Sequence, residues 1–349
     1  MRTRRIRGTA LLITATVLGL AACGTSAYGG AASEASGPAS APAGAGGATG
    51  VERPDLKVAV VPALDSAGFF IALYGGLFRN AGLNVQFIPA TSSETAIAGQ
   101  EKGSYDITGG NYVSYIQAQA AGTANLDIFA EGSVMEPGDQ ALYTMPGSPI
   151  KNLWDLEGHT VGINAPNNIL YLLVASVLAE HGIPVSKVHF RDDIPLPEMA
   201  DALASGEISA AVLPEPFASD AELSYGAVPL TDLDQGATTS FPVQGYVVTK
   251  QWAQKYPRTL AAFYKALEEG QEVADANRSD VEKAMEDIPA PLGLSRQTAA
   301  VMALDQYPAT SGPVGTVDTV RLQRVVDVMQ QFLGFAPSFK VSSMLMNGQ

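Results

Sequence analysis

Six segments that follow predicted strands are expected to line a ligand cleft, and none of them contains lysine, arginine or histidine. They span residues 62–70, 90–94, 108–115, 164–171, 213–217 and 241–246. Asp65, Glu94 and Glu215 would make such a cleft negative. Because a buried charge needs a partner of opposite sign, these residues favour a neutral or cationic ligand with hydrogen-bond donors, such as a nitrogen heterocycle of the pyrimidine or flavin type, or an amine.

Aromatic side chains in the same segments could stack on a ring or on a cation. A small anion is the alternative ligand, held by the N-termini of helices that begin at Ser92, Asn111 and Asn167. The predicted ligand-binding residues are Asp65, Phe69, Ser92, Asn111, Tyr112, Asn167, Tyr171, Glu215, Gln244 and Tyr246.

Several of these residues also have a purely structural interpretation. Asp65 and Asn111 precede predicted helices and are suited to cap them. In the capping-box pattern from Thr91 to Glu94, Thr91 is expected to cap the helix, which leaves Ser92 for the ligand. Asn167 and its neighbour Asn168 compete for one cap position.

No pattern typical of catalysis or metal binding is present, so no catalytic residue, metal site or cofactor is predicted. His159, His181 and His189 lie far apart without metal-ligand spacing, and the chain has a single cysteine. No GxSxG, HExxH, GxGxxG or Walker A sequence occurs.

The single cysteine, Cys23, ends the sequence Leu20-Ala21-Ala22-Cys23, which is typical of a bacterial lipoprotein processing site. Four arginines and a short apolar run precede it, as in a signal peptide over residues 1–22. This pattern predicts a protein lipid-anchored at Cys23 on the extracytoplasmic face of the cell membrane. Export by either the Sec or the twin-arginine route is compatible with it.

Residues 23–53 consist mostly of Gly, Ala, Ser and Pro, which predicts a flexible tether with a reach of about 30 Å. Once residues 1–22 are removed, 35 acidic residues face 17 basic ones. This excess of negative charge argues against a nucleic-acid partner. We expect the folded part to be monomeric.

Short strands alternate with amphipathic helices from Leu56 onward, which predicts an α/β fold with a parallel sheet. The pattern restarts after Pro146-Gly147-Ser148-Pro149, and the part after Gln251 is mostly helical. We therefore expect two three-layer α/β lobes joined by two crossovers, near residues 145–150 and 235–245, around a cleft. Lobe I would span residues 54–147 and 245–349, with the C-terminal helices, and lobe II residues 148–244.

The chain resembles the substrate-binding proteins of sulfonate, nitrate, taurine and thiamine-precursor importers, which have the type II periplasmic-binding fold. The matching sequences are 74–78 with 81–85, similar to "GxF…GLxV"; 103–107, similar to "GxxDI"; 153–162, similar to "DLxGKxVG"; and 203–216, similar to "LxxGxxDAAxxxEP". The resemblance covers about residues 55–270.

The resemblance implies a receptor that closes two lobes around a small solute and delivers it to the permease and ATPase subunits of an ABC importer. A lipoprotein sensor is a further alternative, which a neighbouring histidine kinase gene would indicate. An enzyme similar to thiamine-pyrimidine synthase is disfavoured, because the chain lacks that branch's cysteine cluster and active-site histidine.

Overall fold

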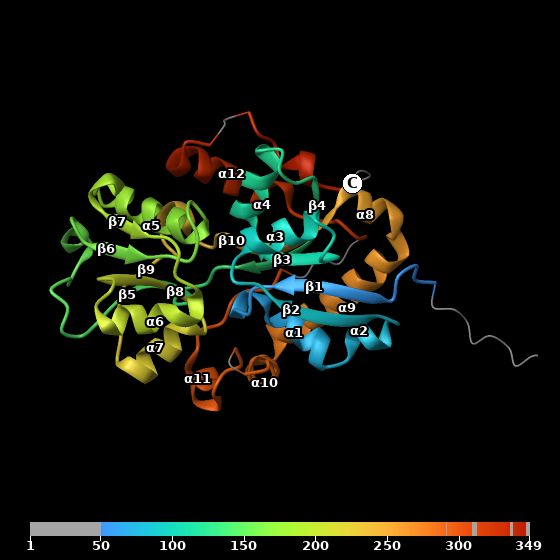
Figure 1. Cartoon of the computed structure of the whole chain (residues 1–349), viewed down its shortest axis with the longest axis horizontal. Helices are drawn as coiled ribbons and strands as arrows, with labels where there is room; N and C mark the ends of the chain where they lie inside the picture. The colour runs from blue at the N-terminus through green and yellow to red at the C-terminus, as the bar shows by residue number, and fades with distance from the viewer. Residues whose placement is uncertain (1–49, 291, 309–312, 336–337, 347–349) are drawn as a thin grey trace, which may run out of the picture. The chain divides into compact units, whose positions relative to one another are not determined.

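The computed structural model describes residues 50–290, 292–308, 313–335 and 338–346. These residues form two five-stranded sheets, each with helices on both sides (Figure 1). The two-lobed α/β fold expected from the sequence is confirmed. The predicted signal peptide, Cys23 and most of the tether lie outside the described residues.

The first sheet has the strand order β2-β1-β3-β10-β4. Its strands are β1 (Asp55–Val60), β2 (Asn84–Pro89), β3 (Ile107–Asn111), β4 (Leu126–Val134) and β10 (Pro242–Thr249). Strands β1, β2 and β3 are parallel, whereas β10 is antiparallel to both β3 and β4. The sheet is thus mixed rather than parallel, because β10 enters it from the second lobe in the opposite direction.

The second sheet has the order β7-β6-β8-β5-β9. Its strands are β5 (Gln140–Thr144), β6 (Thr160–Gly162), β7 (His189–Arg191), β8 (Ala210–Pro214) and β9 (Val228–Asp232). Strands β6, β7 and β8 are parallel, and β5 is antiparallel to β8 and β9.

Strand β5 belongs to the second sheet, whereas the expected boundary at residue 147 would place it in the first lobe. The chain passes from the first sheet to the second between Val134 and Gln140, and it returns between Asp232 and Pro242. Strand β5 follows β4 after a short connection that contains the turn signal Pro137-Gly138, whereas the predicted break lies at the later turn signal Pro146-Gly147-Ser148-Pro149.

Figure 1 shows α3 and α4 on one side of the first sheet and α1, α2 and α9 on the other, while α5 lies opposite α6 and α7 across the second sheet. The helices are α1 (Ala67–Tyr74), α2 (Leu77–Asn80), α3 (Ser93–Glu101), α4 (Tyr112–Ala120), α5 (Ile169–Glu180), α6 (Leu196–Ser205), α7 (Phe217–Tyr225), α8 (Lys250–Lys255), α9 (Pro257–Ala276), α10 (Arg278–Glu286), α11 (Arg296–Val301) and α12 (Thr319–Leu333). Helices α1 and α2 are separated at Gly75 and Gly76, because Gly76 has a positive φ of 80°. None of the described helices has the length and apolar character needed to cross a membrane.

The C-terminal helices do more than pack on the first lobe. Helix α9 packs on α1 and β4, as expected for that lobe. Helix α12 contacts α4 of the first lobe and α5 of the second, and its buried Val325 and Met329 belong to a core that contains residues of both lobes. The end of the chain therefore bridges the two lobes.

Candidate functional site

A cavity of about 40 Å³ lies between the two sheets and is lined by residues of both lobes. The first lobe contributes the ends of β1 and β3 and the starts of η1 (Leu64–Ser66) and α3. The second lobe contributes the start of β5, the end of β8 and the segment before α5. The polar lining residues are Asp65, Ser93, Asn111, Gln140, Asn164, Asn168 and Gln244. Ligands of open α/β sheets bind at such carboxyl ends of strands.

Three helices begin beside this cavity, and each is capped by a side chain of the chain itself. Ser92 accepts from the N–H of Thr95 at the start of α3, and Asn111 accepts from the N–H of Ser114, 2.9 Å away, at the start of α4. Asn168 accepts from two N–H groups of α5. Ser92, not Thr91, is thus the cap of α3, because its extended backbone directs the hydroxyl to the first turn.

Two acceptor groups at the cavity remain without a strong partner. The Oε1 atom of Gln140 is buried and has no hydrogen-bond partner among the described residues. Asp65 accepts only a hydrogen bond of 3.3 Å from the hydroxyl of Ser66. Burial first, and the neighbouring Asp305 second, raise the pKa of the half-buried Asp65 carboxyl to about 8.

Further carboxyl groups lie behind Asp65. Asp139 and Asp305 share a side-chain hydrogen bond, and burial raises the pKa of both groups. Burial also raises the pKa of Glu215, although N–H groups of Ala303 and Ser219 oppose the shift. No lysine or arginine forms an ion pair with any of these four carboxyls in the described part of the chain.

Direct hydrogen bonds connect the two lobes at the rim of the cavity. The backbone N–H of Leu64 donates to the carbonyl of Glu215 over 3.0 Å, and Gln117 Nε2 donates to the carbonyl of Asn167 over 2.7 Å. The Glu215 carboxylate also accepts from the N–H of Ala303, 3.0 Å away. A solute much larger than the present cavity can enter only if such bonds break.

The structure brings some of the predicted ligand-binding residues together at the cavity. Asp65, Asn111 and Gln244 line it. Ser92 and Glu215 lie next to it but bond to the protein itself, and Asn167 is exposed with a φ of 52°.

The predicted aromatic residues do not line the cavity. Phe69, Tyr112 and Tyr246 are buried in the hydrophobic cores, and Tyr171 packs against Phe190 with the ring centroids 4.7 Å apart. The spacing of these aromatic residues along their helices and strands is therefore that of core residues. No aromatic ring is among the residues lining the cavity.

Sequence reasoning did not identify Gln140 or Ser93 as site residues. Gln140 begins the unpredicted strand β5, and only the pairing of β5 with β8 brings it to the cavity. Ser93 Oγ accepts from the backbone N–H and from Nδ2 of Asn111, each 2.9 Å away, and so holds that amide in place. The signal in the sequence that could have identified Ser93 is a hydroxyl directly after the cap of a helix.

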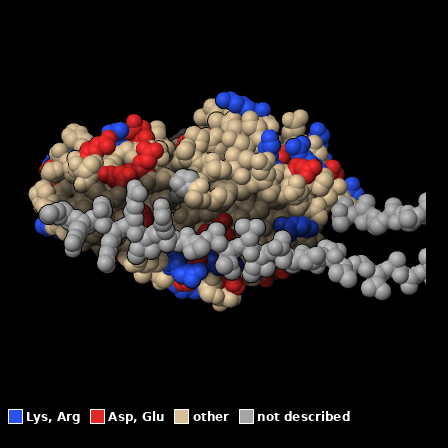
Figure 2. Space-filling view, turned by 60° about the horizontal axis from the view of Figure 1, so that its bottom comes forward, with Lys and Arg blue, Asp and Glu red and all other residues tan. Residues whose placement is uncertain are grey.

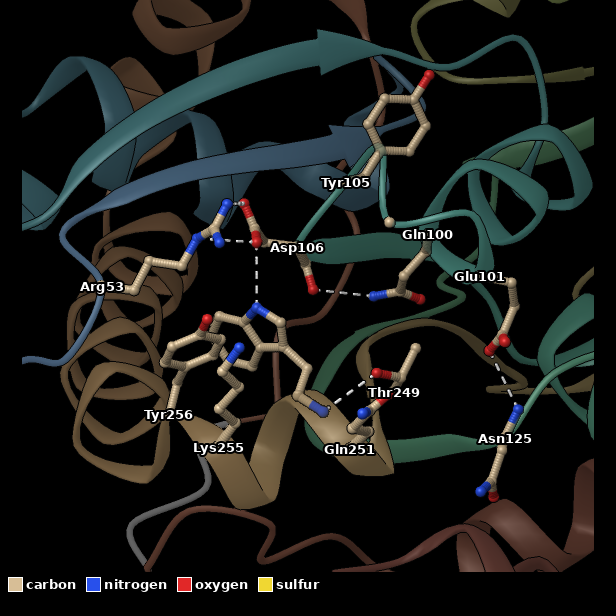
Figure 3. Close-up of a pocket in the computed structure, with 12 residues that line it drawn as sticks. Arg53, Gln100, Glu101, Tyr105, Asp106, Asn125, Thr249, Gln251, Lys255 and Tyr256 are labelled. Carbon is tan, nitrogen blue, oxygen red and sulfur yellow. Dashed lines mark hydrogen bonds and ion pairs between the residues drawn. The ribbon is translucent and has the colours of Figure 1, made fainter.

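A roomier cavity of about 370 Å³ lies within the first lobe, at the opposite edge of its sheet (Figure 3). Asp106 contacts both Arg53 Nε and Trp252 Nε1 at 3.1 Å, so two of this cavity's charged groups are paired. Arg53 and Lys255 also lie against the ring of Tyr256. Because this roomier cavity involves one lobe only, the interlobe cavity is the better candidate for solute capture.

Metal-binding geometry is absent from the part of the chain that the structure describes, where no group of three or more His, Cys, Asp or Glu side chains is placed to hold an ion. His159 contacts the hydroxyl of Ser209 at 3.3 Å, and His181 contacts the carbonyl of Val177 at 2.9 Å.

Comparison with known proteins gives both a family match and structural matches. Residues 63–280 match the family described as NMT1/THI5 like. Among curated proteins, no sequence matches the chain.

The solved structures that resemble the chain include several ABC-type binding proteins. The alkanesulfonate-binding protein SsuA from Xanthomonas axonopodis pv. citri, bound to MOPS, has a TM-score of 0.69 at 16% identity, over 84% of this chain and 98% of that chain. The nitrate-binding protein NrtA from Synechocystis PCC 6803 has a TM-score of 0.70 at 14% identity, over 84% and 85%. The desulfurization enzyme DSZB is also similar, with a TM-score of 0.58 at 16% identity, over 84% and 99%. At these identities the matches establish the fold.

Proposed function

Because the chain belongs to the NMT1/THI5-like family, we propose that it is the substrate-binding protein of an ABC importer. It captures a small solute between its two lobes on the outside of the cell membrane and presents it to the permease and ATPase subunits. The observation that supports this most directly is the interlobe cavity, to which Asp65 and Asn111 of one lobe and Gln140 and Asn164 of the other contribute.

The charge of the lining favours a neutral or cationic solute. Asp65 is the one ionisable residue among those that line the cavity, and no lysine, arginine or histidine is among them. A group of acidic side chains also lies on the side of the second sheet in Figure 2. Attraction of a cationic solute to this surface would speed its encounter with the protein.

A small anion such as a sulfonate or nitrate is the second candidate solute. The proteins described as alkanesulfonate-binding and nitrate-binding share the fold, and three helix N-termini lie beside the cavity. One or two N–H groups in the first turn of each helix are already bonded to Ser92, Asn111 and Asn168, which leaves fewer of them for an anion.

An enzymatic role is the less favoured alternative. One similar structure is an enzyme, DSZB, but the cavity of this chain is lined by amides, one carboxyl group, the hydroxyl of Ser93 and aliphatic side chains. These groups recognise a solute by hydrogen bonds and shape, which is what a binding protein requires.

A lipid anchor at Cys23 would hold the receptor close to the importer, and the tether would raise its effective concentration there. Metabolic labelling with a palmitate analogue tests this part. The Cys23→Ser protein is expected to lose the label and to leave the membrane fraction, whereas retention of both would contradict the anchor.

The solute-binding role is tested by thermal shift of the full chain against pyrimidines, flavins, polyamines, nitrate, taurine and alkanesulfonates. A ligand raises the melting temperature by mass action. A shift with amines or heterocycles is expected, and a shift only with sulfonates or nitrate would favour the anion. Uptake of the identified solute in a strain lacking this protein should fall, and unchanged uptake would contradict a role in import.

A further inference from the structure

We propose that the solute carries a single protonated nitrogen group with N–H donors, an ammonium or an amidinium, which binds between Asp65 of the first lobe and Gln140 of the second. This inference rests on the proposed function, because it names the solute class of the same cavity. It explains why two acceptors at the cavity are left unmatched by the protein.

Gln140 provides the first observation. Gln140 lines the cavity and is 4% exposed, and its buried Oε1 atom has no hydrogen-bond partner among the described residues. A buried acceptor in that state costs about 1–3 kcal/mol. The other amides at the cavity are bonded to the protein: Asn111 to Ser93 and Ser114, and Asn168 to Asn164. A ligand that donates an N–H to Gln140 Oε1 would remove this cost.

Asp65 provides the second observation, independent of the first. Its carboxyl is half-buried, has only the long hydrogen bond from Ser66, and forms no ion pair with the described residues. Since the cavity lining offers it no cation, a ligand with one positive charge and N–H donors satisfies both Asp65 and Gln140. An anion would instead be repelled by the ionised form of Asp65.

The rest of the lining limits the shape of the cation. Ile169, Leu170, Leu196 and Val243 provide an aliphatic wall, which suits an alkyl or small-ring substituent. No aromatic residue is among those that line the cavity, so it lacks the cage with which proteins hold quaternary ammonium groups. The proposed solute class therefore excludes cations without N–H groups.

Capture of such a cation should release a proton. The ionisable groups that interact with Asp65 are Asp305, Asp139 and the phenols of Tyr115, Tyr246 and Tyr307, none of which is basic. Asp139 lies between β4 and β5, and Asp305 lies after α11. Burial and Asp305 raise the pKa of Asp65 to about 8, so the carboxyl is mainly protonated at neutral pH. The cation binds the ionised form, and its affinity should rise with pH.

The test uses fragments of one shape and three charges, namely acetamidinium, acetamide and acetate, with tetramethylammonium as a cation that lacks N–H groups. Binding to the full chain is followed by ligand-observed NMR. Only acetamidinium is expected to bind, and its affinity should rise on the order of tenfold between about pH 7 and about pH 9, as a group of pKa near 8 loses its proton.

Asp65→Asn should weaken acetamidinium binding by about tenfold or more at high pH and abolish the pH dependence, as the loss of one charged hydrogen bond does. Gln140→Leu keeps the charge and should weaken binding by a smaller factor. Asp327→Asn, which removes an exposed carboxylate on α12, should bind as the unchanged protein does.

The proposal is overturned if acetamide, acetate or tetramethylammonium binds as tightly as acetamidinium, if Asp65→Asn binds it unchanged, or if acetamidinium does not bind at about 50 mM. The proposed function is judged separately by uptake. Solute uptake that depends on this protein together with unchanged binding by Asp65→Asn would reject the cation and keep the importer role. If the fragments bind as expected but solute uptake does not depend on the protein, the cation site is kept and the importer role is rejected.

Discussion

The backbone N–H of Leu64 donates to the backbone carbonyl of Glu215 over 3.0 Å, and this bond joins the segment after β1 in the first lobe to the end of β8 in the second. Asp65, the ionisable residue of the cavity lining, directly follows Leu64. The contact between the lobes and the carboxyl proposed to bind the solute therefore lie on the same short turn.

The stability of the protein should fall as pH rises, because of Asp65. Its pKa is raised from 3.8 to about 8 in the folded state, so between these values the folded protein holds a proton that the unfolded chain has lost. The stabilisation is complete below pH 3.8 and is lost as pH rises through about 8. Asp65→Asn should raise the melting temperature at high pH by about 2–4 °C, the shift that about 1 kcal/mol produces. Equal pH slopes of the two proteins in thermal melts would contradict this.

Asp305 should control the pH range of cation binding. Its charge is the second cause of the raised pKa of Asp65, after burial. Asp305→Asn should therefore lower the pKa of Asp65 and strengthen acetamidinium binding near neutral pH. A pH titration of binding measures the midpoint, and a midpoint that stays in place or moves upward would show that Asp305 does not act on Asp65.

Gln117 should help to hold the lobes together. Its Nε2 donates to the carbonyl of Asn167 across the rim of the cavity, 2.7 Å away, and loss of such a bond costs about 1 kcal/mol. Gln117→Ala should increase the radius of gyration of the solute-free protein in X-ray scattering. Gln119→Ala is the matched control, because Gln119 bonds to Leu126 within the first lobe. Equal radii of gyration for the unchanged protein and both variants would contradict a role of Gln117 in holding the lobes together.

The close approach of α1 to α9 depends on Gly68. A Cβ atom there would lie 2.6 Å from Gln271 Cγ and 3.1 Å from Gln271 Cα, which is backbone of α9. Gly68→Ala should lower the free energy of unfolding by about 1–3 kcal/mol, as overpacking does. Gly147→Ala, where a Cβ atom meets nothing within 4 Å, is the control in urea unfolding. Equal midpoints for the two variants would contradict the tight packing.

The order of the elements could largely be predicted from the sequence, because hydrophobic periodicity and helix caps are local signals. The part after Gln251, predicted to be mostly helical, contains the helices α9 to α12. Asn111 was identified because it caps a helix directly after a recognisable strand, and Asp65 because it lies between the first strand and the helix that follows it.

The sequence by itself thus determined the two α/β lobes, the family and the absence of basic residues from the segments expected at the cleft. Only the tertiary structure decided that β5 and β10 run antiparallel within their sheets, since their partners are remote in sequence. It also placed Phe69, Tyr112 and Tyr246 in the cores and Gln140 at the cavity. The physical reason is that a side chain's direction depends on how its helix or strand is rotated against its neighbours, and packing between distant segments sets that rotation.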